Sequence, residues 1–183
     1  MSEIVILSGS PSEFSRSEQV LKYLGTLLEG EQFSVTHISV KDVAYEDLFQ
    51  GNFNSTAVKE IAVKIQHAKG LIVGSPVYKG AYSGVLKALI DILPQDILKH
   101  KPVLPLMTGG SPSHLLAVEY TLKPVLATLK AHNLKGLYLL DRQIDKKNSL
   151  PIIDEDILQR TKKQLFYFVQ LINNPVAREV VTY

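Results

Sequence analysis

The sequence has no cysteine, no long apolar run and no marked excess of either charge. Without cysteine the chain cannot form disulfides, thiolate metal sites or a cysteine nucleophile. The first apolar run, at residues 4–7, is far shorter than the roughly 18 residues of a membrane helix, and the acid Glu3 stands where a signal peptide would be basic. We therefore expect an untargeted cytoplasmic protein.

The charge balance and the length limit further which classes of protein this chain can belong to. Twenty Lys and Arg against 18 Asp and Glu give a formal net charge of +2, and the basic clusters are short, as at residues 146–147 and 162–163. This pattern does not favour a nucleic acid as the main partner. With 183 residues, 45% of them apolar, and no repeat or linker, the chain is expected to form one domain over residues 1–183.

Short apolar runs alternate along the chain with longer segments of helical periodicity. Buried strands separated by helices indicate a parallel sheet, because parallel neighbours need crossover connections. The expected fold is α/β, a doubly wound five-stranded parallel sheet in the order 2-1-3-4-5 with helices on both faces. Strands are expected at residues 4–7, 33–38, 70–75, 103–107 and 136–140, and helices around residues 20–28, 55–68, 82–93, 113–131 and 155–172.

In such a sheet, ligands bind beyond the carboxyl ends of the strands, next to strand 1. Three loops are thereby singled out, at residues 8–17, 75–84 and 108–114. The polar stretch at residues 141–154 is expected to be a lid, an oligomer arm or simply a mobile loop.

The first loop combines hydroxyl side chains with one cation ahead of a helix. A helix N-terminus presents unpaired N–H groups and about half a positive charge, so hydroxyls and Arg16 would complete a site for a phosphate monoester. N-capping and turn formation would account for only one or two of the serines. The loop holds Ser8, Gly9, Ser10, Pro11, Ser12, Ser15, Arg16 and Ser17, and the candidate ligands are Ser10, Ser15, Arg16 and Ser17.

The second loop offers a surface for a planar ring. Tyr78 and Tyr82 are flat and apolar, and Gly80 and Gly84 let a ligand or a second subunit approach the backbone. A hydrophobic turn with its tyrosines in a dimer contact explains the pattern equally well. The candidate ring-binding residues are Pro76, Val77, Tyr78 and Lys79.

The third loop places consecutive glycines after the fourth strand. The N–H groups of Gly109 and Gly110 are expected to meet the carbonyl-rich edge of a ring, and Ser113 is a candidate helix cap. His114 belongs to this loop, although a capping or solvent-facing histidine is the simpler interpretation. The candidate residues are Thr108, Gly109, Gly110, Ser111 and His114.

Several other sites are excluded by missing motifs. No G-x-x-x-x-G-K-[ST] occurs and no G-x-G-x-x-G follows the first strand, which disfavours ATP and a dinucleotide bound in Rossmann fashion. No G-x-S-x-G elbow exists, and the five histidines lack metal-ligand spacing, so no metal is predicted. A receiver domain of the same fold needs acids where this chain has Ser8-Gly9 and Ser75-Pro76.

The three loops together carry a specific resemblance. The segments GSPSEFSRS, SPVYKGAYSGVLKALID and TGGSPSHLLAVEYTLKPVLATLKA resemble the NADPH-dependent FMN reductases of flavodoxin-like fold, above all those that supply alkanesulfonate monooxygenase during sulfonate starvation. The resemblance extends over residues 4–140. It implies FMN as the flavin, NADPH or NADH as the hydride donor, a tetramer built from dimers and a flavin-dependent monooxygenase as partner. Many relatives have Arg directly after GSP, where this chain has Ser12, so Arg16 alone would pair with the phosphate.

The resemblance implies a reaction that needs positioning rather than acid–base chemistry. Hydride transfer belongs to the two cofactor rings, so no catalytic side chain is predicted. The amides of residues 109–111 and Lys79 would stabilise negative charge at the N1 and O2 edge of the flavin. A quinone or azo reductase with tightly bound FMN would use the same loops. A flavodoxin-type electron carrier would too, although such carriers are usually strongly acidic and this chain carries +2.

Tyr120 lies where a predicted helix changes its apolar register, between residues 118 and 122. Pro124 removes an amide that would have bonded back to Tyr120, so we predict a π-bulge here rather than a buried tyrosine beside an ordinary proline kink. The resemblance implies an inserted tyrosine at this place, proposed to prevent FMN from staying permanently bound.

Oligomerisation is expected through the helices that start near Tyr82 and Ser113. The first of these carries more apolar side chains than one sheet-facing stripe requires.

Overall fold

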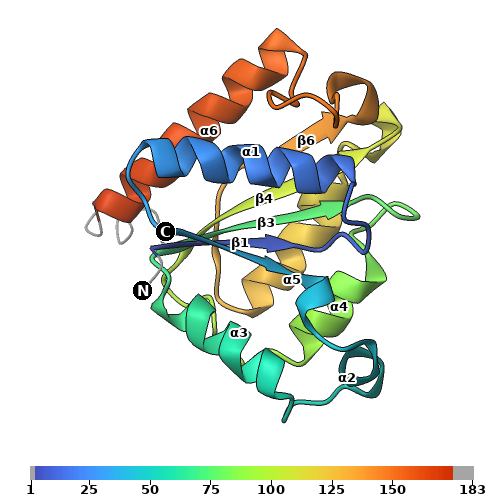
Figure 1. Ribbon diagram of the computed structural model, residues 1–183, viewed down its shortest axis with the longest axis vertical. Coiled ribbons are helices and arrows are strands. Elements are labelled where there is room, and N and C mark those ends of the chain that lie inside the picture. The colour runs from blue at the N-terminus through green and yellow to red at the C-terminus, as the bar shows by residue number, and fades with distance from the viewer. Residues whose placement is uncertain (1–2, 175–183) are drawn as a thin grey trace.

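The computed structural model describes residues 3–174 as a parallel sheet between two layers of helices (Figure 1). All strand pairs are parallel, and β2, β1, β3 and β4 lie side by side in that order, with β5 and β6 both along the outer edge of β4. This confirms the doubly wound α/β fold and the order 2-1-3-4-5, with the fifth strand split in two. The strands are β1 Ile4–Ser8, β2 Val35–Ser39, β3 Gly70–Pro76, β4 Pro102–Gly109, β5 His132–Asn133 and β6 Leu137–Leu140.

The central strands are apolar throughout because both faces of the sheet are covered. β1 and β4 are buried along their whole length, as expected of parallel strands between two helical layers. β2 lies at one edge and is mostly half-buried, which matches its alternating sequence. The apolar runs therefore distinguish central strands from edge strands.

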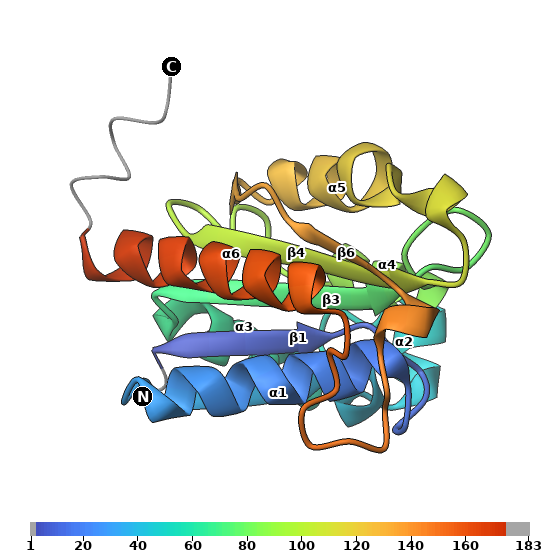
Figure 2. The same ribbon diagram turned by 90° about the horizontal axis from the view of Figure 1, so that it is seen from above.

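The helices divide between the two faces of the sheet (Figures 1 and 2). α1 Arg16–Gly30 and α6 Glu155–Asn173 cover one face and share a core with the even-numbered residues of β1, such as Ile4 and Ile6. α3 Thr56–His67, α4 Gly84–Asp91 and α5 Lys123–Thr128 cover the other face, with Val5 and Leu7. No helix within residues 3–174 is long and apolar enough to cross a bilayer.

One predicted helix is wrong. The segment expected to be helical over residues 113–131 consists of a 3₁₀-helix, η2 Pro112–His114, a π-helix, η3 Val118–Leu122, and the short α5. Pro124 cannot donate a backbone hydrogen bond, so it is tolerated only in the first turn of α5, and the regular helix begins there and not at residue 113. Ser111 rather than Ser113 is the cap, since its Oγ accepts from the Ser113 N–H at 3.2 Å.

The remaining predicted helices and strands agree with the structure within two residues at each end, except that α1 begins at Arg16, four residues before the predicted start at residue 20. Three short helices were missed, η1 Val40–Asp42, α2 Tyr45–Gln50 and η4 Asp141–Gln143. α2 buries none of its residues, so it has no apolar stripe facing the core that a periodicity search could detect. It ends at Gly51, which has a left-handed φ of 65°.

Residues 141–154, called the arm below, form an ordered hairpin-like excursion. It begins with η4 Asp141–Gln143 and is closed by a bridge between Ile144 and Ile152. Its Lys146 Nζ donates to the carbonyl of Phe14 at 3.2 Å and lies 4.9 Å from the centre of the Phe14 ring. The arm therefore rests on the first of the three candidate loops.

Candidate active site

The structure brings the three predicted loops together at the carboxyl edge of the sheet. Ser83 at the start of α4 donates its hydroxyl hydrogen bond to the carbonyl of Gly9, which joins the second loop to the first. The Val77 N–H donates to the Thr108 carbonyl at 2.7 Å, which joins the second loop to the third. Direct hydrogen bonds thus fix the relative positions of the loops.

Gly9 is required by the close approach of α4 to the first loop. A Cβ on Gly9 would lie 2.8 Å from Leu86 Cδ2 and 2.9 Å from Leu86 Cβ. Leu86 is fully buried, so it has little room to move away. Any side chain at position 9 would push the first two loops apart.

The serine hydroxyls of the first loop are largely used to hold the loop itself. Ser15 is the N-cap of α1, and its Oγ accepts from the Glu18 N–H at 3.1 Å and lies 3.1 Å from Ser17 Oγ. Ser10 is fully buried and donates to the Ser12 carbonyl at 3.0 Å. Capping therefore accounts for Ser15, and internal loop bonds account for Ser10.

Glu18 is a component of this loop that sequence reasoning missed. Its carboxylate is almost fully buried and accepts a short hydrogen bond from the Ser8 hydroxyl. An acid in the first turn also faces the positive end of the helix dipole. Glu18 thus anchors the end of β1 to the first turn of α1.

The backbone amides are what the first loop leaves free. Within residues 3–174, the N–H groups of residues 13–17 have no hydrogen-bond acceptor, whereas those of Ser10, Ser12 and Glu18 are all bonded. Five consecutive free donors at a helix N-terminus form a typical cradle for an anion. An anion bound at this loop would therefore meet free amides rather than free hydroxyls.

Arg16, the cation expected to pair with a phosphate, is tied to the arm. Its Nε donates to the Asp141 carbonyl at 3.1 Å, and its Nη1 lies 3.8 Å from Asp141 Oδ2. Both side chains are 40% exposed, so the guanidinium keeps a solvent-facing portion available to a ligand. The ion pair positions Arg16 beside the cradle. Asp141 was missed because no local pattern links residues 125 positions apart.

The second loop is a tight turn with strained backbone. Tyr78 and Ala81 exchange two backbone hydrogen bonds, at 2.8 and 3.2 Å, and the two residues between them, Lys79 and Gly80, have φ values of 51° and 80°. Positive φ at both central positions defines a type I′ turn, and a non-glycine residue in this conformation is strained. The turn presents Tyr78, which is 48% exposed, while Pro76, Val77 and Tyr82 are half-buried around it.

Tyr138 of β6 holds the third loop in place through a hydrogen bond. The Tyr138 hydroxyl donates to the Ser111 carbonyl at 2.6 Å, and a Cβ on Gly109 would lie 2.5 Å from that hydroxyl oxygen. Burial, and secondarily the nearby Asp141 carboxylate, raises the pKa of Tyr138, so the hydroxyl keeps its proton. Thr108 and Gly109 are buried and Gly110 is exposed, while Ser111 and His114 are half-buried.

The π-helix predicted around Tyr120 is confirmed. The Lys123 N–H donates to the Val118 carbonyl five residues earlier, which is the defining bond of a π-turn. Thr121 Oγ1 also donates to the Ala117 carbonyl, at 2.6 Å. Tyr120 is 75% exposed, so the alternative of a buried tyrosine is wrong.

The candidate residues fit an aromatic ring carrying a phosphate. The free amides of the first loop would hold the phosphate, with Ser15, Ser17 and Arg16 beside them. The strained turn at Lys79 and the exposed amide of Gly110 would face the two sides of a ring. FMN has this composition, whereas no three His, Asp or Glu side chains within residues 3–174 are grouped to hold a metal ion.

Known proteins share both the sequence and the fold of this chain. A protein named FMN reductase (NADPH), from Escherichia coli strain K12, is 43% identical over 171 residues, which cover 93% of this chain and 90% of that protein. The NADH-dependent FMN reductase SfnF of Pseudomonas putida is 30% identical over 182 residues, which cover 95% of each chain.

A solved structure agrees with these relatives. The crystal structure of the apo form of NADH:FMN oxidoreductase EMOB superimposes with a TM-score of 0.78 at 33% identity, covering 92% of this chain and 88% of that one. Residues 2–145, which contain all three loops and the π-helix, match the family described as NADPH-dependent FMN reductase. With the loops joined at one sheet edge, the free amide cradle and these likenesses, the chain belongs to the NADPH-dependent FMN reductase family.

Proposed function

We propose that the chain reduces FMN with NAD(P)H at the carboxyl edge of the sheet and releases the reduced flavin to a separate monooxygenase. Reduction of FMN by NADPH follows from the family to which the chain belongs. Release to a monooxygenase, as in desulfonation of alkanesulfonates, rests on the resemblance of the π-helix segment to reductases of that type. The donor is left as NAD(P)H because one relative is named for NADPH and another for NADH.

Each loop has a distinct task in this proposal. The amides of residues 13–17 and the free portion of Arg16 hold the FMN phosphate. Pro76, Val77, Tyr78 and Lys79 support the ring, and Thr108, Gly109, Gly110, Ser111 and His114 line its other edge.

The flavin supplies the ring that accepts the hydride, and the protein supplies position and charge. The amides at Gly110 and Ser111 stabilise negative charge that develops at the ring edge they face. Tyr138 stays protonated and fixes the carbonyl of Ser111, which keeps the third loop in place. No side chain has to donate or accept a proton for the hydride to move.

The π-helix is the observation that best supports the proposed release of reduced flavin. It begins at Val118, directly after the third loop, and displays Tyr120 on the surface. A π-turn costs helix stability, and such turns recur at functional sites. A wide turn next to the ring-binding loop supports flavin that binds as a substrate and leaves, rather than flavin held as a fixed group.

The test follows the flavin through one turnover. Protein passed through gel filtration is expected to emerge colourless and then to oxidise NADPH with free FMN as a saturable substrate. Adding an alkanesulfonate monooxygenase and octanesulfonate is expected to yield sulfite that depends on this chain. A yellow protein that gives parallel double-reciprocal plots with a quinone, and no sulfite, would instead establish a reductase with tightly bound FMN.

A further inference from the structure

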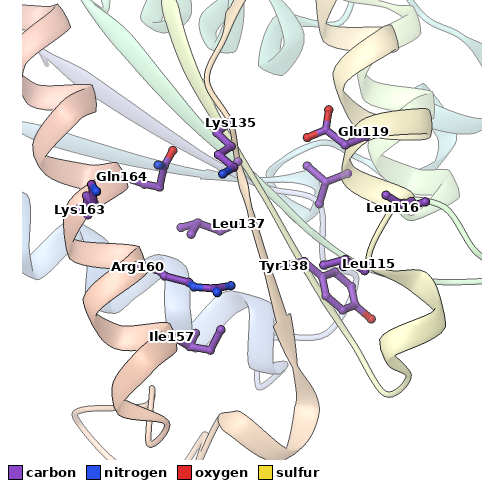
Figure 3. Close-up of a pocket in the computed structure, with 12 residues that line it drawn as sticks. Leu115, Leu116, Glu119, Lys135, Leu137, Tyr138, Ile157, Arg160, Lys163 and Gln164 are labelled. Carbon is purple, nitrogen blue, oxygen red and sulfur yellow. The ribbon is translucent and has the colours of Figure 1, made fainter.

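A recess outside the candidate active site opens at the edge of the sheet, where β6 lies between η3 and α6 (Figure 3). Its volume is about 570 Å³, within the usual range of small-molecule sites. None of the thirteen residues assigned above to FMN lines it. The recess is therefore a separate cavity of ligand size.

The recess exists because the edge strand is interrupted. β5 ends at Asn133 and β6 begins at Leu137, and between them Gly136 has a φ of 83°. A Cβ on Gly136 would lie 2.9 Å from both Pro105 and Val118, so only glycine lets the backbone sit this deep. The inward bend hollows out the sheet edge between the two overhanging helices.

The walls of the recess are apolar on both sides. Leu115 and Leu116 line it from the segment before η3 and are 57% and 55% exposed, which is unusual for leucines beside a cavity. Leu137 of β6 and Ile157 of α6 line the opposite side (Figure 3). These surfaces suit an apolar ligand body of one ring or a short chain.

The rim of the recess carries three cations without carboxylate partners. Lys135, Arg160 and Lys163 line it, and no Asp or Glu within residues 3–174 forms an ion pair with any of them. In Figure 3, Arg160 extends from α6 across the recess towards Tyr138. The one acid in the lining, Glu119, is already paired with Lys123 at 2.5 Å. The recess thus has a net positive rim over an apolar floor.

The recess also contains a buried hydrogen-bond acceptor that a ligand would have to satisfy. Gln164 lines the recess, and its Oε1 is buried with no hydrogen-bond partner. A buried polar atom left unpaired costs free energy, so this atom needs a donor. A hydroxyl or amide group on a ligand would satisfy it.

We propose that this recess binds an organic anion that combines an apolar body, a hydrogen-bond donor and a sulfonate or carboxylate head. The head lies between the three cations, the body lies against the leucines, and the donor bonds to Gln164. The site shares none of the residues assigned to FMN, but it borders the proposed reductase site, because Val118 and Glu119 of η3 and Tyr138 line it.

The test is calorimetric titration of the full chain, without flavin, with 4-hydroxybenzenesulfonate. This probe has the head, the ring and the donor, whereas phenol lacks the head, inorganic sulfate lacks the ring and benzenesulfonate lacks the donor. Saturable binding is expected for 4-hydroxybenzenesulfonate and, more weakly, for benzenesulfonate. Binding of 4-hydroxybenzoate as well would show that a carboxylate head is also accepted. No saturable binding of either hydroxylated anion would overturn the proposal.

Variants locate the probe. Arg160→Gln is expected to weaken binding by about tenfold, because it removes a charge-assisted contact. Lys162→Gln changes a neighbouring cation of α6 that does not line the recess, and it is expected to leave affinity unchanged. Gln164→Leu is expected to abolish the advantage of the hydroxylated probe over benzenesulfonate. Loss of binding in Arg16→Ala but not in Arg160→Gln would place the probe in the phosphate loop and refute the site.

Discussion

Arg16 shows at the scale of one residue how a structural contact can coexist with the binding role proposed for the first loop. Its Nε bonds to the arm, and the rest of the guanidinium lies beside five free amides. A single side chain thus both holds the cradle and adds charge to it. The two roles can be separated by comparing ligands that differ only in the phosphate.

Arg16→Ala is expected to weaken FMN by about tenfold or more and riboflavin by much less, since a charge-assisted hydrogen bond contributes roughly 1.5–3 kcal/mol. Fluorescence titration of both flavins measures this. Lys22→Ala, an exposed cation on the same helix, serves as the control and is expected to change neither affinity. Equal losses for the two flavins would show that Arg16 acts through the arm and does not touch the phosphate.

His37 on β2 is expected to make the stability of the fold depend on pH. A side chain at Gly25 of α1 would collide with its ring, and the partial desolvation of the imidazole lowers the pKa of His37 below its ordinary value of 6.5. The unfolded chain therefore binds the proton more readily than the folded one. Stability from this source is present above pH 6.5 and is lost as the pH falls through the folded pKa.

The urea midpoint of unfolding is accordingly expected to fall as the pH drops below 6.5, and to fall less steeply in His37→Gln. Urea denaturation at a series of pH values measures both slopes. Replacing the exposed His67 at the end of α3 by Gln gives the matched control. Identical slopes for the parent and His37→Gln would rule out His37 as a source.

The sequence predicts the π-helix η3 well. It does not predict how η3 places the side chain of Tyr120. A change of apolar register and Pro124 together require an irregular turn, and the structure places it at Val118–Leu122. That Tyr120 faces solvent could not be deduced, because exposure depends on what the folded chain packs against it.

Deleting Tyr120 is expected to restore a regular helical turn and to yield protein that retains FMN through gel filtration. Turnover with free FMN is expected to fall as release slows. Absorbance near 450 nm per mole of protein, measured before and after gel filtration, reports retention. Tyr120→Ala removes the aromatic ring but keeps the extra residue, so it distinguishes the effect of the side chain from that of the insertion. A colourless deletion variant with the parent's rate would remove η3 from the mechanism.

Among the structural elements, the strands were predictable from the sequence, but the contacts between distant segments were not. Continuous apolar runs identify β1, β3 and β4 because both their faces are buried, and the position of the three loops follows from strand order. The contacts that complete the site, such as Arg16 with Asp141 and Tyr138 with Ser111, join segments with no local signal. The arm was expected only as a lid, an oligomer arm or a mobile loop.

Of the two segments expected to form oligomer contacts, the one after Ser113 exposes Leu115, Leu116 and Tyr120, whereas the one after Tyr82 exposes little apolar surface. The surplus apolar side chains after Tyr82, including Leu86, Ile92 and Leu93, are buried within the same chain, so the reason given for an interface on α4 was wrong. The aromatic side chains of α2 and the turn after it are exposed instead: Tyr45 is 78%, Phe49 92% and Phe53 66% exposed. α2 packs beside α4, so these exposed aromatic side chains lie near the segment expected to form the interface.

We expect the protein to be a dimer or tetramer by light scattering at micromolar concentration, with these aromatic side chains in the contact. Phe49→Ser is expected to shift the mass towards the monomer. Val63→Ser, at a half-exposed position of α3, is the control and is expected to keep the parent's mass. A monomeric parent would contradict the prediction, and an unchanged Phe49→Ser oligomer would return the contact to the segment around Tyr120.

The bond between Arg16 and Asp141 also dictates the order in which the protein can be completed during synthesis. The two residues are 125 positions apart, and they meet only after β1, β3, β4 and β6 lie side by side. At about 5–20 residues per second, the phosphate loop leaves the ribosome roughly 6–25 s before its partner does. The contact that holds Arg16 beside the proposed phosphate site therefore forms only after these four strands have paired.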